Sequence, residues 1–242
     1  MVKTLISIIL PTYNEADSIC LLIKEITKIL NENNSLYELI VVDDNSPDGT
    51  AKRVMENFTN NEKVKLFIRK KEKGLATAIR YGIERSKGEV AVVMDTDFNH
   101  PPSLIPLLVK ITEYFDIAIG SRYVIGGGMK TSKFRFIGSK FFNILTRYLL
   151  GVQTRDNLSG FVAFKKRILS DFNLSKIFYG YGDYFIRFLY LAQKQRKTII
   201  EVPVVYEIRQ GGTSKTNFYK EIIRYTLSVI KIRFGIWKEH TS

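Results

Sequence analysis

The chain has 242 residues, of which 45% are apolar and 25% are charged. This composition suits one globular α/β domain or two small ones, and it excludes disordered and collagen-like chains. The single cysteine rules out an intrachain disulfide, and no apolar run reaches the roughly 18 residues that a membrane-spanning helix needs. We therefore expect a soluble chain suited to a reducing compartment.

Five short segments rich in β-branched residues predict strands at Leu5–Leu10, Tyr37–Val42, Val64–Ile68, Glu89–Met94 and Asp116–Ile119. The stretches between them have the period of amphipathic helices, as between Ile19 and Leu30. Strand and helix alternate, which predicts a parallel sheet with helices on both faces. Ligands of such sheets bind beyond the carboxyl ends of the strands, so we expect functional residues directly after each strand.

Polar, acidic loops follow the first two predicted strands, at residues 11–15 (Pro-Thr-Tyr-Asn-Glu) and 43–50 (Asp-Asp-Asn-Ser-Pro-Asp-Gly-Thr). The chain contains neither the glycine fingerprint of dinucleotide-binding folds nor a P-loop, which excludes a glycine cradle for nucleotide phosphates. Two interpretations of Asp44 stay open. It belongs to a turn that caps the next helix, or its carboxylate binds a ribose or a base.

Asp95-Thr96-Asp97 follows the fourth predicted strand. Because side chains alternate along an extended backbone, Asp95 and Asp97 project to the same side and can share one hard cation, and Asn99 offers a third oxygen. Mg²⁺ prefers one or two carboxylates together with substrate phosphates, so this pair suits a bound nucleoside diphosphate better than a closed metal cage. The two histidines of the chain are too few and too far apart for a zinc site.

The net charge of +13, from 37 basic and 24 acidic residues, predicts anionic partners. Residues 117–155 contain seven Lys/Arg and no acid, and residues 208–238 contain seven Lys/Arg and one acid, Glu221. These two segments account for the whole excess. In residues 133–149 and 219–238 the basic residues are interleaved with apolar ones, so these helices either lie in a membrane interface or pack their apolar faces on the core.

Seven motifs occur in order along the chain. They are Pro-Thr-Tyr-Asn-Glu at 11–15, Val-Val-Asp-Asp-Asn-Ser-Pro-Asp-Gly-Thr at 41–50, Glu-Lys-Gly-Leu-Ala-Thr-Ala-Ile at 72–79, Met-Asp-Thr-Asp-Phe-Asn-His-Pro-Pro at 94–102, Ile-Gly-Ser-Arg-Tyr-Val-Ile-Gly-Gly at 119–127, Ser-Gly-Phe at 159–161 and Arg-Gln-Gly-Gly-Thr-Ser-Lys at 209–215. This combination resembles the family 2 glycosyltransferases, and most closely the dolichol-phosphate mannose synthase group. Two positions depart from the usual pattern, Asn157-Leu158 before Ser-Gly-Phe and Arg187 where an acid is common.

The resemblance implies a GT-A fold, a Rossmann-like and mostly parallel sheet flanked by helices, which binds a nucleotide sugar and Mg²⁺ or Mn²⁺. It implies that the nucleotide end is held by Pro11, Tyr13, Glu15, Val42, Asp44 and Thr96. It implies metal ligation by Asp95, Asp97 and Asn99. The positions near the acceptor phosphate are Arg122, Arg135 and Ser139, and those of a closing loop are Arg209 and Lys215. The residues implied to take part in catalysis are Asp95, Asp97, Arg122, Arg209 and Lys215.

The predicted reaction is inverting transfer of mannose from GDP-mannose to dolichyl or another polyprenyl phosphate. A phosphate monoester is largely dianionic at neutral pH because its second pKa is near ~6, so the attack needs charge compensation rather than a general base. We expect a catalytic domain over residues 1–215, with a nucleotide-sugar half to about residue 120, and an amphipathic C-terminal helix over 216–242. The expected location is peripheral, at the cytosolic face of a membrane, with a membrane-anchoring subunit as a further expected partner.

Three alternatives stay open. The first keeps the enzyme class but uses UDP-glucose or another nucleotide sugar. The second is a nucleotidyltransferase, which ordinarily has a glycine- and arginine-rich loop after its first strand. The third is a nonenzymatic nucleic-acid-binding protein that uses the basic aromatic segments. It leaves Asp43, Asp44, Asp95 and Asp97 unexplained, because carboxylates repel a nucleic-acid backbone, so we do not expect nucleic acid as a partner.

Overall fold

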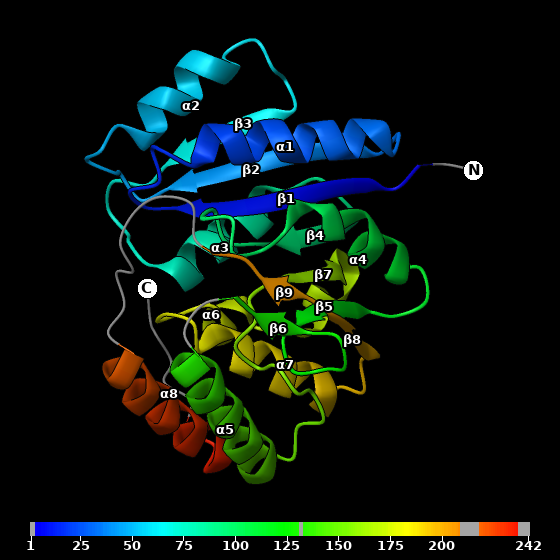
Figure 1. The fold of residues 1–242 in the computed structure, drawn as a ribbon, viewed down its shortest axis with the longest axis vertical. Coiled ribbons are helices and arrows are strands. Elements are labelled where there is room, and N and C mark those ends of the chain that lie inside the picture. The colour runs from blue at the N-terminus through cyan, green and yellow to red at the C-terminus, as the bar shows by residue number, and fades with distance from the viewer. Residues whose placement is uncertain (1–2, 131–132, 209–217, 237–242) are drawn as a thin grey trace.

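The computed structural model describes residues 3–130, 133–208 and 218–236. Seven strands form a central sheet in the order β3-β2-β1-β4-β7-β5-β8 (Figure 1). Every neighbouring pair is parallel except those of β7, which runs antiparallel to β4 and β5. The strands are β1 (Leu5–Thr12), β2 (Leu36–Asp43), β3 (Val64–Ile68), β4 (Val90–Val93), β5 (Ile117–Ser121), β7 (Val162–Lys165) and β8 (Ile199–Pro203). A separate parallel pair consists of β6 (Gly128–Met129) and β9 (Val205–Tyr206).

Helices cover both faces of the sheet (Figure 1). They are α1 (Ile19–Glu32), α2 (Thr50–Phe58), α3 (Leu75–Arg85), α4 (Ile105–Ile111), α5 (Lys133–Leu150), α6 (Leu174–Ile177), α7 (Tyr184–Lys194) and α8 (Phe218–Arg233), with 3₁₀ turns at Pro102–Leu104 and Lys166–Asp171. The mostly parallel α/β architecture and the first five strands are as the sequence predicts. The antiparallel strand β7 and the strand β8 were not predicted.

Two hydrophobic cores lie on opposite faces of the sheet because successive strand side chains alternate. Ile8 and Leu10 of β1 pack with Ile23 of α1 in one core. Ile9, between them in the sequence, packs with Ile79 of α3 in the other. Burial on both faces explains why these strands are apolar nearly throughout.

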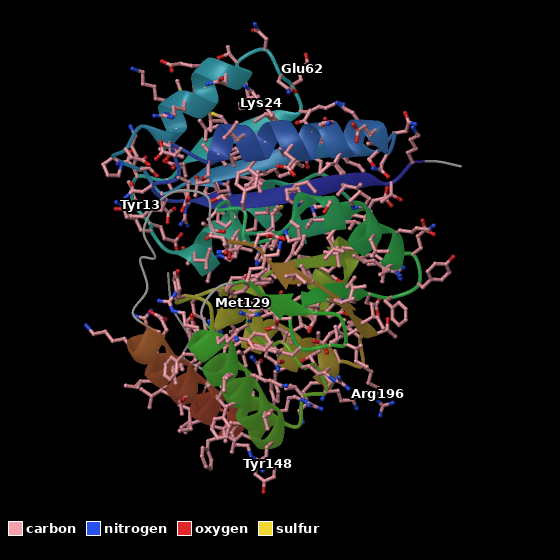
Figure 2. The ribbon with its side chains drawn as sticks, in the orientation of Figure 1. Tyr13, Lys24, Glu62, Met129, Tyr148 and Arg196 are labelled. Carbon is pink, nitrogen blue, oxygen red and sulfur yellow. The ribbon has the colours of Figure 1, made fainter. Side chains whose placement is uncertain are left out.

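A third core joins α5 and α8, which lie side by side in Figure 1. It contains Phe142 of α5 and Tyr225, Val229 and Ile232 of α8. Each helix also carries an exposed apolar stripe, formed by Phe134, Ile137, Phe141, Ile144 and Tyr148 on α5 and by Ile223, Leu227, Ile230 and Phe234 at α8. Figure 2 shows Tyr148 pointing away from the protein. Each helix therefore packs one apolar face on the core, as one of the two interpretations predicts, and exposes another. Placement of these helices in a membrane interface stays a prediction.

The helices of the described residues are all too short or too polar to cross a membrane.

Candidate active site

A cavity of about 780 Å³ lies at the carboxyl ends of β1, β2 and β4. Figure 2 places Tyr13 at this edge of the sheet. Loops that are far apart in the sequence line this cavity together, because parallel strands end at the same edge. The predicted site residues among its lining are Pro11, Tyr13, Glu15, Asp44, Asp95, Thr96 and Asp97.

The two carboxylates of the Asp-x-Asp loop differ in exposure. Asp97 is 7% exposed, and its Oδ1 and Oδ2 accept hydrogen bonds from the backbone N–H and Nδ2 of Asn99, at 3.1 and 2.7 Å. The Asp95 side chain is 47% exposed. In the described part of the chain, no three His, Cys, Asp or Glu side chains converge as a metal cluster. Two carboxylates facing a nucleotide-sized cavity fit a Mg²⁺- or Mn²⁺-type ion whose other ligands are phosphates and water.

His100, at the end of this loop, is fully buried. Its Nδ1 accepts the backbone N–H of Asp95 at 3.0 Å. Burial is the main reason why the pKa of this imidazole is lowered to about 4. The ring is therefore neutral at pH 7, and because its Nδ1 is an acceptor, its proton is on Nε2.

Asp44 lines the cavity, and hydrogen bonds within the protein fix its carboxylate in place. Its Oδ1 accepts the Nε–H of the buried Arg69 at 2.7 Å, and its Oδ2 accepts the N–H of Gly74 at 2.7 Å. Asp48, rather than Asp44, binds the start of α2, through the N–H and hydroxyl of Thr50 at 3.0 and 2.6 Å. Asp44 thus fixes the loop before α3 against the end of β2, and the interpretation of Asp44 as a helix cap is wrong.

Lys73 is a cavity residue that the sequence reasoning did not select. Its Nζ lies 5.3 Å from the centre of the Tyr13 ring, so an aromatic face and a cation lie together at the end of the cavity that is predicted to hold the nucleotide. Val42, which the resemblance places at the nucleotide, is fully buried in the core beside Ile40 and Ile79 and does not line the cavity.

A second cavity, of about 240 Å³, adjoins the first. Its lining includes the three residues that the resemblance places near the acceptor phosphate, Arg122, Arg135 and Ser139. The two cavities have five lining residues in common, Leu158, Tyr181, Gly182, Glu221 and Tyr225. Two of these come from α8, so this helix forms a wall between the two cavities.

The Arg122 guanidinium is 7% exposed and is held by Asp156, which is fully buried. The Nε–H and Nη2–H groups of Arg122 donate to the two carboxylate oxygens at 2.8 and 2.7 Å, and its backbone N–H donates at 3.0 Å. Burial alone lowers the pKa of Arg122, but the Asp156 carboxylate outweighs this effect and holds that pKa above its ordinary value. The bidentate pair leaves Arg122 charged, with its orientation fixed at the second cavity. Arg209 and Lys215, assigned to a closing loop, lie outside the described residues.

Comparison with known proteins identifies the family. The sequence profile of glycosyl transferase family 2 matches residues 7–172, which is more than half of the chain. The chain belongs to glycosyl transferase family 2. This family membership confirms the resemblance that the seven motifs indicate.

Three curated relatives align with most of the chain. A dolichol-phosphate mannosyltransferase of Pyrococcus furiosus is 37% identical over 231 residues, which cover 94% of this chain and 63% of the relative. The polyprenol monophosphomannose synthase of Mycolicibacterium smegmatis is 32% identical, with coverage of 86% and 79%. The undecaprenyl-phosphate mannosyltransferase of Micrococcus luteus is 33% identical, with coverage of 86% and 85%. This family 2 chain therefore spans less than two thirds of the Pyrococcus protein.

Solved structures support the fold. Glucosyl-3-phosphoglycerate synthase from Mycobacterium tuberculosis, with Mn²⁺ and UDP-glucose, superimposes with a TM-score of 0.71 at 20% identity, over 98% of this chain and 81% of that one. The same enzyme with Mg²⁺ and UDP gives a TM-score of 0.72, over 98% and 81% of the two chains. The predicted GT-A-like fold is confirmed.

Arg187, one of the two departures from the family pattern, is a buried structural residue rather than part of the cavity lining. It forms an ion pair with Asp183 and donates to the Ile177 carbonyl at 2.9 Å and to the Ser228 hydroxyl at 3.1 Å. These bonds connect α7 to α6 and α8. The other departure is Asn157-Leu158, of which Asn157 is fully buried and Leu158 lines both cavities.

The close approach of α8 to the loop before α7 gives a testable prediction. A Cβ atom at Gly182 would lie 2.5 Å from the Tyr225 hydroxyl. We expect Gly182→Ala to lower the free energy of unfolding by about 1–3 kcal/mol, because such overpacking forces a shift, and to slow sugar transfer by moving a cavity wall. Urea unfolding and initial rates measure both effects.

Two further variants test the cause. Adding Tyr225→Phe to Gly182→Ala removes the clashing hydroxyl, and should restore most of the stability. Gly128→Ala is the matched control, because its Cβ meets nothing within 4 Å. Equal stability of Gly182→Ala and Gly128→Ala would contradict the close contact.

Proposed function

We propose that this chain transfers mannose from GDP-mannose to a polyprenyl phosphate, with inversion at the anomeric carbon. The observation that carries the proposal is the pair of adjoining cavities, one with two strand-end carboxylates and one with a buried, oriented arginine. The names of the three relatives, all enzymes of mannose transfer to polyprenyl-type lipids, support this choice of sugar and acceptor.

Asp95 and Asp97 would hold a divalent cation, which when bound offsets the charge that builds on the departing diphosphate. Tyr13 and Lys73, which line the same end of the cavity, would bind the base and a phosphate. Asp44 keeps the loop that carries Lys73 in place through its bond to Gly74.

Arg122 would bind the acceptor phosphate in the second cavity. The incoming phosphate is an anion that approaches an anionic donor, so it needs a fixed positive charge more than it needs a base. The Asp156 carboxylate orients the guanidinium, and Arg135 at the same cavity adds a second cation. A lipid-phosphate oxygen would form the new bond to the anomeric carbon as the bond from that carbon to the nucleoside diphosphate breaks, and direct displacement of this kind inverts the anomeric centre.

A donor screen tests the proposal. The purified chain is incubated with Mg²⁺, a polyprenyl phosphate and radiolabelled GDP-mannose, UDP-glucose or UDP-N-acetylglucosamine in parallel. We expect label in the organic phase from GDP-mannose only, and none when the lipid phosphate is replaced by the free alcohol. Transfer from a UDP-sugar instead would correct the donor, and no lipid product from any donor would contradict the reaction.

We also propose that the exposed stripes of α5 and α8 dock on an anionic lipid bilayer at the cytosolic face. The stripes combine apolar side chains such as Phe141 and Leu227 with the exposed cations Lys140 and Lys231, and the only acid on the two helices is Glu221. Charge and hydrophobicity of this kind fit a membrane surface with acidic headgroups. This placement sets the second cavity, which both helices line, next to the source of the lipid acceptor.

Vesicle binding tests this surface. We expect Phe141→Asp combined with Leu227→Asp to weaken binding to phosphatidylglycerol-containing vesicles by about tenfold or more, because each apolar side chain contributes on the order of 1.5–3 kcal/mol when buried. Leu107→Asp, which alters an exposed leucine of α4, is the matched control. Binding that is equal in all three proteins, or equally strong to neutral vesicles, would contradict the proposed surface.

A further inference from the structure

One group of side chains lines both cavities of the candidate active site. In the proposed reaction the sugar is bonded first to the donor diphosphate and then to the acceptor phosphate, so it has to lie where the two cavities meet. The residues that line both are Leu158, Tyr181, Gly182, Glu221 and Tyr225, and we call them the junction. Residues of the junction are therefore the candidates for contact with the sugar.

Glu221, in the first turn of α8, is the only acid of the junction, and among the described residues it is the only acid that lines the second cavity. The same cavity contains the cations Arg122 and Arg135. A carboxylate repels a phosphate, so Glu221 is unsuited to bind the diphosphate or the acceptor phosphate. The uncharged part of the substrates is the sugar, whose hydroxyl groups can donate hydrogen bonds to an ionised carboxylate.

The Glu221 carboxylate keeps the capacity to accept hydrogen bonds. Its Oε2 is buried, and its Oε1 accepts the Nη1–H of Arg224 at 3.4 Å, which is longer than an ordinary hydrogen bond. The Tyr225 hydroxyl lies close by: burial is the main reason why the pKa of Tyr225 is raised, and the Glu221 carboxylate raises it further. An ionised carboxylate has about four acceptor sites, more than these two neighbours occupy.

We propose that Glu221 is a specificity-determining residue for the transferred sugar, and that its Oε1 accepts a hydrogen bond from a sugar hydroxyl in place of the long bond from Arg224. The Arg224 side chain is 57% exposed and can turn. Because Arg224 also lines the first cavity, its charge stays near the anionic donor after this exchange. The inference rests on the proposed function, because it takes the two cavities to be those of donor and acceptor.

A structural role for Glu221 makes a different prediction. An acid in the first turn of a helix is stabilised by the positive end of the helix dipole. Loss of this stabilisation would disturb the cavity wall and weaken every ligand alike. Loss of a hydrogen bond to the sugar weakens the nucleotide sugar but not the nucleoside diphosphate, which has no sugar at this place. The ratio of the two affinities therefore separates the roles.

Isothermal titration calorimetry, with Mg²⁺ and without a lipid acceptor, measures this ratio. Wild type, Glu221→Leu and Glu221→Gln are each titrated with GDP-mannose and GDP, and in parallel with UDP-glucose and UDP. We expect Glu221→Leu to bind the nucleotide sugar about 10–100-fold more weakly, the worth of a hydrogen bond to a charged group, and the nucleoside diphosphate nearly as wild type does. Glu221→Gln keeps one acceptor oxygen and should lose less.

Glu56→Leu is the matched control. It also removes a helical acid that pairs with a cation of its own helix, Lys52 at 3.8 Å, but Glu56 lines neither cavity. This variant should bind all ligands as wild type does.

Donors in which one sugar hydroxyl is replaced by hydrogen identify the partner of Glu221. We expect one such donor to bind wild type as weakly as Glu221→Leu binds the complete sugar, and Glu221→Leu to bind both donors equally, because the interaction is already lost. If each missing hydroxyl lowered the affinity of wild type and of Glu221→Leu by the same factor, no hydroxyl would contact Glu221 and the inference would fail.

The outcomes distinguish the inference from the function on which it rests. If wild type binds a nucleotide sugar and Glu221→Leu weakens that sugar and its nucleoside diphosphate to the same extent, the inference fails and the proposed function stands. If wild type binds neither GDP-mannose nor UDP-glucose, the proposed function and the inference fail together.

Discussion

Asp97→Asn and Asp97→Ala are expected to lower kcat/KM for sugar transfer by about 10³-fold or more, at every Mg²⁺ or Mn²⁺ concentration. Asp97 is buried in the loop after β4, and both of its carboxylate oxygens accept hydrogen bonds from Asn99, so it is the more rigid of the two carboxylates. Without it, a cation at this site would be held by the half-exposed Asp95, and the departing diphosphate would lose most of its charge compensation. Label transferred to the organic phase measures the rate.

The asparagine variant and a charge-matched control make this result interpretable. Asparagine keeps the size of the side chain, so a folded Asp97→Asn protein that is inactive shows loss of the carboxylate and not of the fold. Asp17→Asn removes an acid whose side chain is 79% exposed and which contacts Arg53 at 3.7 Å, and this variant should transfer sugar at the wild-type rate. Activity that returns in Asp97→Ala at high Mg²⁺ would show that Asp97 is not required.

The strands of the sheet could be predicted where the local sequence pattern is enough to identify a strand. The strands that became β1 to β5 are short β-branched runs separated by helical periods, and burial on both faces makes them apolar throughout. β7 has only Val162–Lys165, and nothing in four residues indicates direction or neighbours. Its place between β4 and β5 comes from pairing with strands far away in the sequence, which local spacing does not encode.

The loops of the candidate site were predictable for a related reason, since residues that follow parallel strands lie at the same edge of the sheet. The contacts that hold these loops in place could not be predicted. Arg122 and Asp156 are 34 residues apart, and Asp44 and Gly74 are 30 apart. One signal was present, because Asp156 is the first acid after a long basic segment that has none.

The sequence also did not allow us to predict which face of the last helix is buried. In the last helix, Ile223, Leu227 and Ile230 are exposed, while Tyr225 and Val229 are buried in the core that α8 shares with α5. When a helix has two apolar stripes, its own sequence does not determine which of the two is buried. Which stripe is buried depends on the neighbouring helix, and this choice makes α8 both a cavity wall and an exposed surface.

The second large effect concerns the buried ion pair of Arg122 and Asp156. We expect Asp156→Ala to lower the free energy of unfolding by about 3–5 kcal/mol, because it leaves a buried guanidinium without its counter-charge. Urea unfolding measures this. It should also raise the KM for the lipid phosphate, since the guanidinium is no longer held in one orientation. Binding of Mn²⁺ with GDP, at the other cavity, should change little in the protein that remains folded.

A double-mutant cycle separates support of the fold from binding of the acceptor. Arg122→Met and Asp156→Asn each leave one partner uncompensated, but the double variant leaves no unpaired buried charge, and asparagine can still accept the backbone N–H of residue 122. We expect the double variant to be more stable than the sum of the single effects by about 0.5–3 kcal/mol. Its transfer to lipid phosphate should nevertheless stay as poor as that of Arg122→Met. If the double variant regained both stability and transfer, Arg122 would be needed only for the fold. The acceptor phosphate would then have to be bound by another cation of the second cavity, such as Arg135.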